Sequence, residues 1–365
     1  MRHAFLRSLA LPLGALAVAL TSSCGSDPVT TGSTGGTGGG TPGAKCPEGL
    51  IKAPGSEFCD ASAKAVDCRL VTAADRNQVC GVPLRDPTDE LKRSATVKEY
   101  AGAGAPKLDC FTEAGYPPKP AASSLVQMSG TVKIFAHGCE SKLVKIEVFE
   151  VGADGALGTP AGTALTTAMD CKVNGVASDN KDCGTPRYEC NYIYGNVPTE
   201  KELVVRTSGL NWAELYDYNV YIPAAEVVNG EWKHNLRALA SDDYNSIAQS
   251  AIGGPITSGN GALAGEVHDC GDVRLQNAIV DIDQPKKIIT YFTSNEANPI
   301  PDINATGTSI LGLYAALDVA PGPVTVAALG NVSGKATTLG YYRARVFPNA
   351  VSIVTFRGTE PFQIP

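Results

Sequence analysis

The sequence lacks the motifs by which most enzymes and metal sites are recognised. Among its 365 residues are only four histidines, and it contains no C-x-x-C, no H-E-x-x-H and no G-x-S-x-G. These absences argue against zinc ribbons, thioredoxin-like redox centres, metalloproteases and serine hydrolases. The segment Gly330–Lys335 has too few residues between its glycines for a phosphate-binding loop. We therefore expect no enzyme activity, no cofactor and no metal.

Positive charge and long apolar segments are also scarce. Acidic residues outnumber basic ones by 37 to 30, which gives a net charge of −7 and a pI near 5.2. This balance argues against a nucleic-acid partner and against a polybasic membrane patch. Beyond the N-terminal segment, no stretch approaches the roughly 18 continuous apolar residues of a membrane-spanning helix. We expect no transmembrane helix in the body of the chain.

Residues 1–24 have the parts of a secretory signal peptide. Arg2 and Arg7 supply positive charge, and a short apolar run over 9–20 follows. The run ends in Thr-Ser-Ser before Cys24, and small residues at this point are typical of a cleavage site. The sequence therefore predicts export from the cytoplasm.

This end of the chain resembles a bacterial lipoprotein signal. The resemblance implies that Cys24 carries lipid, becomes the mature N-terminus and anchors the chain in the cell envelope, at the outer membrane or cell surface. Thr21 stands where the family usually has leucine, and ordinary signal cleavage near Ser23 is the alternative. Residues 25–44 are nearly all Gly, Thr, Ser and Pro, so they predict a flexible tether with an end-to-end distance of about 25 Å.

The remaining cysteines predict disulfides. Without Cys24 the count is even, and an even count in an exported chain indicates disulfide bonds. Five lie before the proline cluster at 117–120 and five after it, so an odd number of bonds must cross that point if all are oxidised. We expect Cys270 or Cys139 to form a crossing bond, with Cys171 joined to Cys183 or Cys190. The ten candidates are Cys46, Cys59, Cys68, Cys80, Cys110, Cys139, Cys171, Cys183, Cys190 and Cys270.

Composition divides the body into four parts. Residues 45–120 are rich in cysteine and end in the proline cluster, which cannot continue a helix or a central strand. A first β-rich region is predicted over 124–233 and a second over 258–365. Between them, 234–257 is predicted to be a helical connector.

Strands dominate the two β-rich regions. At 144–148, Val, Ile and Val alternate with charged residues, which is the pattern of a half-buried strand. Turn residues separate this segment from further candidates. These candidates are 132–135, 186–194, 201–207, 217–222 and 225–232.

One segment has a helical period. Apolar residues recur at intervals of three and four over 236–251, and Gly253-Gly254 ends the run. Asn235 is the predicted N-cap. We expect this amphipathic helix to pack at the junction of the two β-rich regions.

The second β-rich region repeats the first. The segment 263–267 matches 128–132, with Gly-x-Val in common, and 278–282 matches 144–148. Likewise 312–314 matches 192–194, and 319–326 matches 197–204. The order of a Gly-x-Val strand, an Ala-x-Val strand, a Tyr-containing strand and a Pro-Gly-x-Val-Thr-Val strand resembles the carboxypeptidase regulatory-like (transthyretin-like) β-sandwich. The resemblance implies a mainly β fold with two seven-stranded immunoglobulin/transthyretin-like sandwiches, and an extracytoplasmic, non-catalytic role.

Two His-x-Cys pairs and one Asp pair are the candidates for metal ligation. His137/Cys139 and His268/Cys270 could hold zinc or copper, but cysteines in disulfides and histidines in turns are the favoured interpretation. Asp281 and Asp283 lie on one face of a predicted strand and could hold calcium, although such residues more often contact water.

The densest aromatic cluster is the candidate binding surface. It could stack on a sugar or on a partner, although buried core aromatics are favoured over this alternative. The sequence therefore supports two hypotheses: a structural or binding component of the envelope, and a sugar- or peptide-binding accessory protein that uses this surface. The expected partners are the membrane, through lipid, and an unidentified envelope protein or polysaccharide. The cluster is Trp212, Tyr216, Tyr218 and Tyr221.

Overall fold

In the computed structural model, the described part of the chain is mainly β and contains one α-helix. No helix in this part is long and apolar enough to cross a membrane. The signal peptide, Cys24, the tether and the cysteines at 46, 59, 68, 80, 139 and 183 lie outside it, and so does His137. The residues described are 95–99, 106–111, 115–135, 144–164, 170–174, 187–295, 299–332 and 335–363.

In the N-terminal half, one strand is central to the pairing. Strand β2 pairs antiparallel with β7 and parallel with β10 and β11, while β8 lies between β3 and β9. The strands are β2 (Leu125–Ile134), β3 (Lys145–Val151), β4 (Leu157–Pro160), β5 (Thr163–Ala164), β6 (Asp170–Asn174), β7 (Arg187–Pro198), β8 (Glu202–Gly209), β9 (Trp212–Tyr221), β10 (Glu231–Lys233) and β11 (Leu236–Ala240).

The C-terminal half pairs its strands in the same way. Strand β12 pairs antiparallel with β17 and parallel with β20, while β18 lies between β14 and β19. The strands are β12 (Gly261–Glu266), β13 (Leu275–Gln276), β14 (Ile279–Ile282), β15 (Ile288–Phe292), β16 (Pro301–Asp302), β17 (Leu313–Val319), β18 (Gly322–Val332), β19 (Lys335–Val346) and β20 (Val351–Val354).

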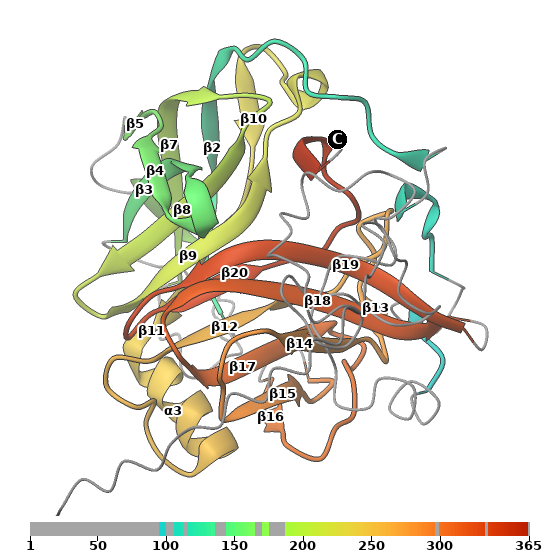
Figure 1. The fold of residues 1–365 in the computed structure, drawn as a ribbon. Coiled ribbons are helices and arrows are strands. Elements are labelled where there is room, and N and C mark those ends of the chain that lie inside the picture. The colour runs from blue at the N-terminus through green and yellow to red at the C-terminus, as the bar shows by residue number, and fades with distance from the viewer. Residues whose placement is uncertain are drawn as a thin grey trace, which may run out of the picture. The chain divides into compact units, whose positions relative to one another are not determined.

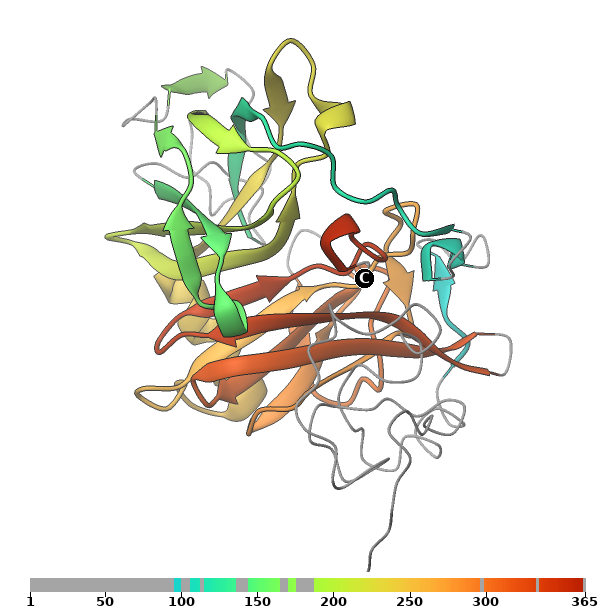
Figure 2. The same ribbon diagram turned by 45° about the horizontal axis from the view of Figure 1, so that its top comes forward.

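The two halves share a sheet. Strand β9 of the first half pairs in parallel with β20 of the second, and this joins the strands of the first half to β12, β15, β16, β17 and β20 in one hydrogen-bonded sheet. Strands β14, β18 and β19 form a separate sheet. Figure 1 shows the two strands side by side, with the green and yellow strands beyond β9 and the orange strands beyond β20, and Figure 2 shows the same junction after a 45° turn. The halves are therefore continuous through backbone hydrogen bonds.

A glycine and a tyrosine explain why Gly-x-Val recurs. In the first half, Gly130 on β2 lies opposite Tyr192 on β7, and the Tyr192 hydroxyl donates to the carbonyl oxygen of His234 at 2.8 Å. A Cβ atom on Gly130 would lie 1.9 Å from that same oxygen. Only glycine allows the neighbouring backbone to approach so closely.

The second half repeats this arrangement. Gly265 on β12 lies opposite Tyr314 on β17, and the Tyr314 hydroxyl donates to the carbonyl oxygen of Val354 at 2.7 Å. A Cβ atom on Gly265 would lie 1.8 Å from this oxygen. Tyr314 therefore corresponds to Tyr192, and the sequence match of 312–314 with 192–194 was displaced by two residues. Because strand side chains alternate with a period of two, residues matched with a two-residue offset still point to the same face of the strand.

The predicted helix begins later than its apolar period indicated. Residues 236–240 form strand β11, and helix α3 covers Ser241–Ile252. The predicted N-cap was wrong, because the cap position is Ala240 and the Asn235 side chain instead accepts hydrogen bonds from the amide and hydroxyl of Thr131. The predicted end is confirmed: Gly253 adopts the left-handed conformation, with φ 72°.

One predicted strand was also wrong. The predicted strand 225–232 begins inside a turn of 3-10 helix, Ala224–Glu226, and only its last two residues belong to a strand, β10 (Glu231–Lys233). A turn at Asn229 and Gly230, both with positive φ, separates the two. The other predicted strands overlap β2, β3, β7, β8 and β9.

The end of the Cys-rich segment packs on the C-terminal half. Strand β1 (Lys98–Glu99) pairs with β13, and the Val97 side chain is buried. A Cβ atom on Gly330 would lie 2.1 Å from a Val97 methyl carbon, so this glycine makes room for the valine.

A disulfide and one carboxylate connect residues 107–110 to the C-terminal half. Cys110 is bonded to Cys270, with their Cα atoms 5.8 Å apart, so the bond crosses the proline cluster. Asp269 is fully buried, and its carboxylate accepts a hydrogen bond from the backbone amide of Lys107 at 2.9 Å. The amide of Cys270 donates in turn to the Lys107 carbonyl at 3.0 Å. In the N-terminal half, β6 and β7 place Cys171 opposite Cys190 in the strand register.

Candidate functional site

The aromatic cluster does not form an exposed surface. Tyr216, Tyr218 and Tyr221 are buried, and Trp212 is partly buried against the core of the N-terminal half. The Tyr216 ring stacks on Phe347 with centroids 3.9 Å apart. The interpretation of these residues as a sugar- or peptide-binding surface is therefore wrong, because strand β9 directs its tyrosines into the packing between the two halves.

The second His-x-Cys pair has a different role from metal binding. The Cys270 sulfur is in the disulfide, so it offers no thiolate. The ring of His268 lies between two carboxylates, with Nδ1 2.7 Å from Asp272 and Nε2 2.8 Å from Glu266. Among the described residues, no group of three or more His, Cys, Asp or Glu side chains is arranged to hold a metal.

The aspartate pair of β14 is occupied by protein groups. Asp281 forms an ion pair with Lys286 at 2.6 Å. Asp283 accepts a hydrogen bond from the backbone amide of Thr325 at 2.7 Å, and burial raises its pKa above the usual range. Both carboxylates thus have partners within the fold.

A cavity of about 640 Å³ lies on one face of the shared sheet. Strands β9, β20 and β12 run parallel here, with β17 antiparallel beside β12. Alternate residues point to opposite faces of a sheet. Those on one face pack into the core of the C-terminal half, and those on the other line the cavity.

The cavity floor changes from apolar to polar along the strands. At one end, Leu215 lies opposite Val351 in the register, and Val351 lies opposite Ala262. At the other end, the same face carries Glu266 and Thr355. Because these strands are parallel, the change from apolar to polar side chains runs in the same direction on each of them. The floor therefore has one apolar end and one polar end.

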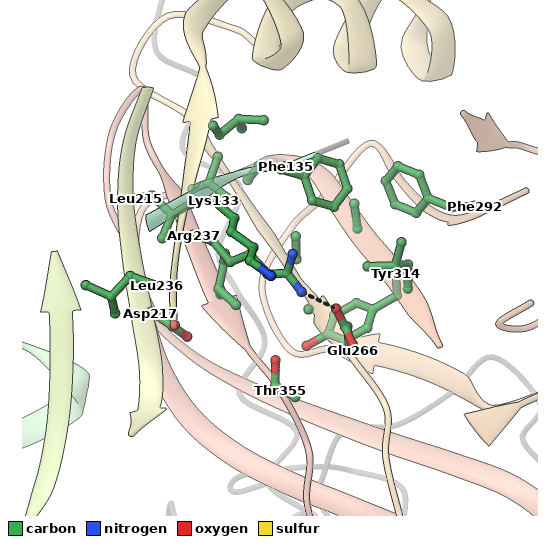
Figure 3. Close-up of a pocket in the computed structure, with 18 of the residues that line it drawn as sticks. Lys133, Phe135, Leu215, Asp217, Leu236, Arg237, Glu266, Phe292, Tyr314 and Thr355 are labelled. Atoms are coloured by element: carbon green, nitrogen blue, oxygen red, sulfur yellow. Dashed lines mark ion pairs between the residues drawn. The ribbon is translucent and has the colours of Figure 1, made fainter. Parts of the chain in front are cut away.

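Small side chains create the space. The middle of the floor contains Ala264 and its register partner Ala315, whose methyl side chains occupy little volume. Phe135 and Phe292 lie edge to face at the apolar end, with ring centroids 6.2 Å apart (Figure 3). Ile247 of helix α3 also lines the cavity. A hollow lined by apolar side chains with a few converging polar groups is typical of small-molecule sites.

Glu266 is the centre of the charged end. Its carboxylate lies 2.8 Å from His268 Nε2, 3.0 Å from Arg274 Nε and 3.7 Å from an Arg237 guanidinium nitrogen. Figure 3 shows the Arg237 side chain extending across the floor to Glu266. Burial alone would raise the pKa of Glu266, but the hydrogen bond and charge of His268 and the two arginines lower it to about 2. Glu266 is therefore ionised at physiological pH.

His268 is held toward its cationic form. Burial disfavours the charged ring, but hydrogen bonds to Asp272 and Glu266 outweigh this effect and raise the pKa of His268. The hydrogen bond from His268 also lowers the pKa of Asp272, with help from Arg357, whose Nε lies 2.9 Å from the carboxylate.

Asp217 differs from the other acids of the cavity. Burial raises its pKa to about 6, although the charges of Arg357 and Arg237 act in the opposite direction. Its carboxyl group forms no ion pair with a described residue. Asp217 thus lies among positive groups without direct contact.

Two further polar atoms at the cavity are unpaired. The Nε2 atom of His234 and the hydroxyl of Tyr244 are buried and have no hydrogen-bond partner among the described residues. Burial lowers the pKa of His234 to about 4, so its ring is neutral, and the ring stacks on Trp232 with centroids 4.6 Å apart. Buried polar atoms are normally paired, so such atoms beside a cavity point to a missing partner.

No local sequence pattern indicated this site. The lining comes from segments near 133, 217, 237, 266 and 355, which lie far apart in the chain. One signal was present: the same-face residues of 262–266 and of 351–355 both change from apolar to polar. Their significance depends on the strands being neighbours, and only the structure shows this.

Comparisons with known proteins found similarity only to solved structures. No protein-family description matches it, and no curated protein matches it. Among solved structures, a streptococcal ancillary pilin is similar at 10% identity and a TM-score of 0.17, covering 65% of this chain and 63% of its own length. The shaft pilin SpaA from Lactobacillus rhamnosus GG is similar at 8% identity and a TM-score of 0.18, covering 66% of this chain and 99% of its own. At these TM-scores the likeness carries no argument about topology or function.

Proposed function

We propose that this chain is a non-enzymatic, exported lipoprotein that is anchored through lipid on Cys24 and serves as a structural or binding component of the bacterial envelope. Its partner would be an envelope protein or a polysaccharide. The observation that carries the proposal is the disulfide between Cys110 and Cys270. Disulfides persist in oxidising compartments outside the cytoplasm, which is where the signal peptide would send the chain.

The composition of residues 25–44 supports anchoring. A Gly- and Thr-rich coil directly after a lipid-bearing cysteine would separate the folded body from the membrane by about 25 Å. An amphipathic or polybasic surface is then unnecessary for attachment, which is consistent with the net charge of −7.

The described site supports a binding role over a catalytic one. Three of its basic side chains, His268, Arg274 and Arg237, contact Glu266, and its remaining lining is mostly apolar. Such an arrangement can hold a ligand, whereas nucleophilic catalysis requires a nucleophile beside a general base.

Replacement of Cys24 by serine tests the proposal. We expect wild-type protein in the membrane fraction with an acyl mass on its N-terminal peptide, and Cys24→Ser in the soluble exported fraction. Ser26→Ala, two residues further on, is the matched control and should remain in the membrane. The proposal is wrong if Cys24→Ser stays membrane-bound and the wild-type N-terminus carries no acyl group.

A further inference from the structure

We propose that the cavity over β9, β20, β12 and β17 binds an amphipathic acid, a small molecule with an apolar chain and one carboxylate head group. The proposal goes beyond envelope anchoring, because the cavity is a property of the folded body whether or not Cys24 carries lipid. It rests on three features of the cavity: its size, its charge and its unpaired polar atoms.

The size suits a chain-like ligand. The cavity volume of about 640 Å³ lies within the roughly 300–1,000 Å³ that is usual for small-molecule sites. From Ala262 to Glu266 the strand advances about 13 Å, at roughly 3.3 Å per residue. A medium-length acyl chain can lie along this direction, over Ala264 and Ala315, with its apolar end beside the Phe135 and Phe292 pair.

The charge selects an acidic head group. The polar end contains more cationic than acidic side chains, in contrast to the net negative charge of the whole chain. Two of its three acids, Glu266 and Asp272, are already paired with His268 and arginines. The cations are Lys133, Arg237, Arg274 and Arg357, and the acids are Asp217, Glu266 and Asp272.

Two of the cations remain available to a ligand. Lys133 is exposed and forms no ion pair with a described residue. Among the described residues, the Arg237 guanidinium forms one ion pair, with Glu266 at 3.7 Å. A ligand carboxylate near Arg237 would form the charge-assisted, bidentate contact that guanidinium groups favour.

The unpaired atoms are the independent evidence for a ligand. His234 and Tyr244 line the cavity, and the Nε2 atom of His234 and the hydroxyl of Tyr244 have no hydrogen-bond partner among the described residues. Each can donate to or accept from a polar atom of a bound molecule. A ligand without polar atoms would leave both unsatisfied, whereas a ligand carboxylate can pair with one of them.

Titration with dodecanoate, below the concentration at which it forms micelles, tests the proposal. The protein is the full-length exported chain carrying Cys24→Ser, so that acyl groups on the protein cannot compete. The chain has only two tryptophans, and Trp232 stacks on His234 at the cavity, so tryptophan fluorescence reports occupancy alongside calorimetry. We expect saturable binding of one dodecanoate per chain.

Two variants locate the ligand. Ala264→Leu fills the floor and should weaken binding at least tenfold, while Ala225→Leu at an exposed position should leave it unchanged. Arg237→Gln changes an exposed side chain and should weaken dodecanoate at least fivefold without affecting uncharged dodecanol. Lys201→Gln, an exposed cation outside the cavity, is its control.

Three results would overturn the inference. They are the absence of saturable dodecanoate binding, equal binding by the Ala264→Leu and wild-type proteins, and binding of dodecyltrimethylammonium as tightly as dodecanoate with no effect of Arg237→Gln. The Cys24→Ser fractionation does not depend on any of them, so the cavity proposal and the anchoring proposal fail separately.

Discussion

The carboxyl group of Asp217 should make the stability of this protein fall as the pH rises. Its pKa is raised from 3.8 to about 6 in the folded chain, because burial disfavours the charged form. Between these values the folded state binds the proton and the unfolded state releases it. A group with a raised acid pKa therefore destabilises the fold above its unfolded pKa, and the effect is complete above pH 6.

The magnitude follows from the shift. A difference of about two pKa units corresponds to about 3 kcal/mol of unfolding free energy at neutral pH, of which about 2 kcal/mol develops between pH 4.5 and pH 7. Asp217→Asn keeps the shape of the side chain and removes its titration. We expect the variant to gain about 2 kcal/mol relative to wild type over this pH interval.

Urea denaturation at the two pH values measures the difference. The control is Asp242→Asn, an exposed position on α3. Comparing each variant with wild type at the same pH cancels the titration of all other groups, including Glu266 and His268. If the advantage of Asp217→Asn over wild type is the same at pH 4.5 and pH 7, the carboxyl group is not destabilised by burial and the reasoning is wrong.

Two other predictions concern covalent and steric constraints. Removing the disulfide with Cys110→Ser and Cys270→Ser together should lower the free energy of unfolding by about 2–5 kcal/mol, because the bond spans 160 residues and restricts the unfolded chain. Non-reducing peptide mapping should first recover the two cysteines in one linked peptide, and two free thiols would contradict the prediction. Gly265→Ala should cost at least about 2 kcal/mol in thermal or urea unfolding, because its Cβ atom would lie 1.8 Å from a backbone oxygen. Gly254→Ala, with nothing within 4 Å, is the control, and equal losses for both glycines would refute the packing argument.

Local sequence patterns predicted most strands, and they failed where the same pattern fits both a helix and a strand. The alternation at 144–148 has no helical counterpart, and it forms part of β3. The apolar residues of 236–240 fit a helix as well as a strand, because five residues are too few to separate the periods. Leu236 pairs with Val132 on β2, and this pairing stabilises the strand. The two residues are more than a hundred positions apart in the sequence, so no local pattern includes both.

Burial of the aromatic cluster also depended on distant packing. Within the sequence, Tyr216 and Tyr218 could lie on a solvated strand face as readily as in a core. In the structure, β9 lies between β8, β11 and β20, and Phe347 and Tyr342 from the C-terminal half cover the two rings. Their burial is a consequence of the joined sheet.

The sequence by itself determined the mainly β class, the end of the helix at Gly253 and the recurrence of Gly-x-Val, because each depends on local backbone preference or on a period of a few residues. Tertiary structure alone decided the cavity. Its charged end exists because Asp217, Glu266 and Arg357, from three strands or their ends, are brought together by parallel pairing. Parallel neighbouring strands need long connections, so the residues that line the charged end are far apart along the chain. No local sequence pattern can therefore predict the cavity.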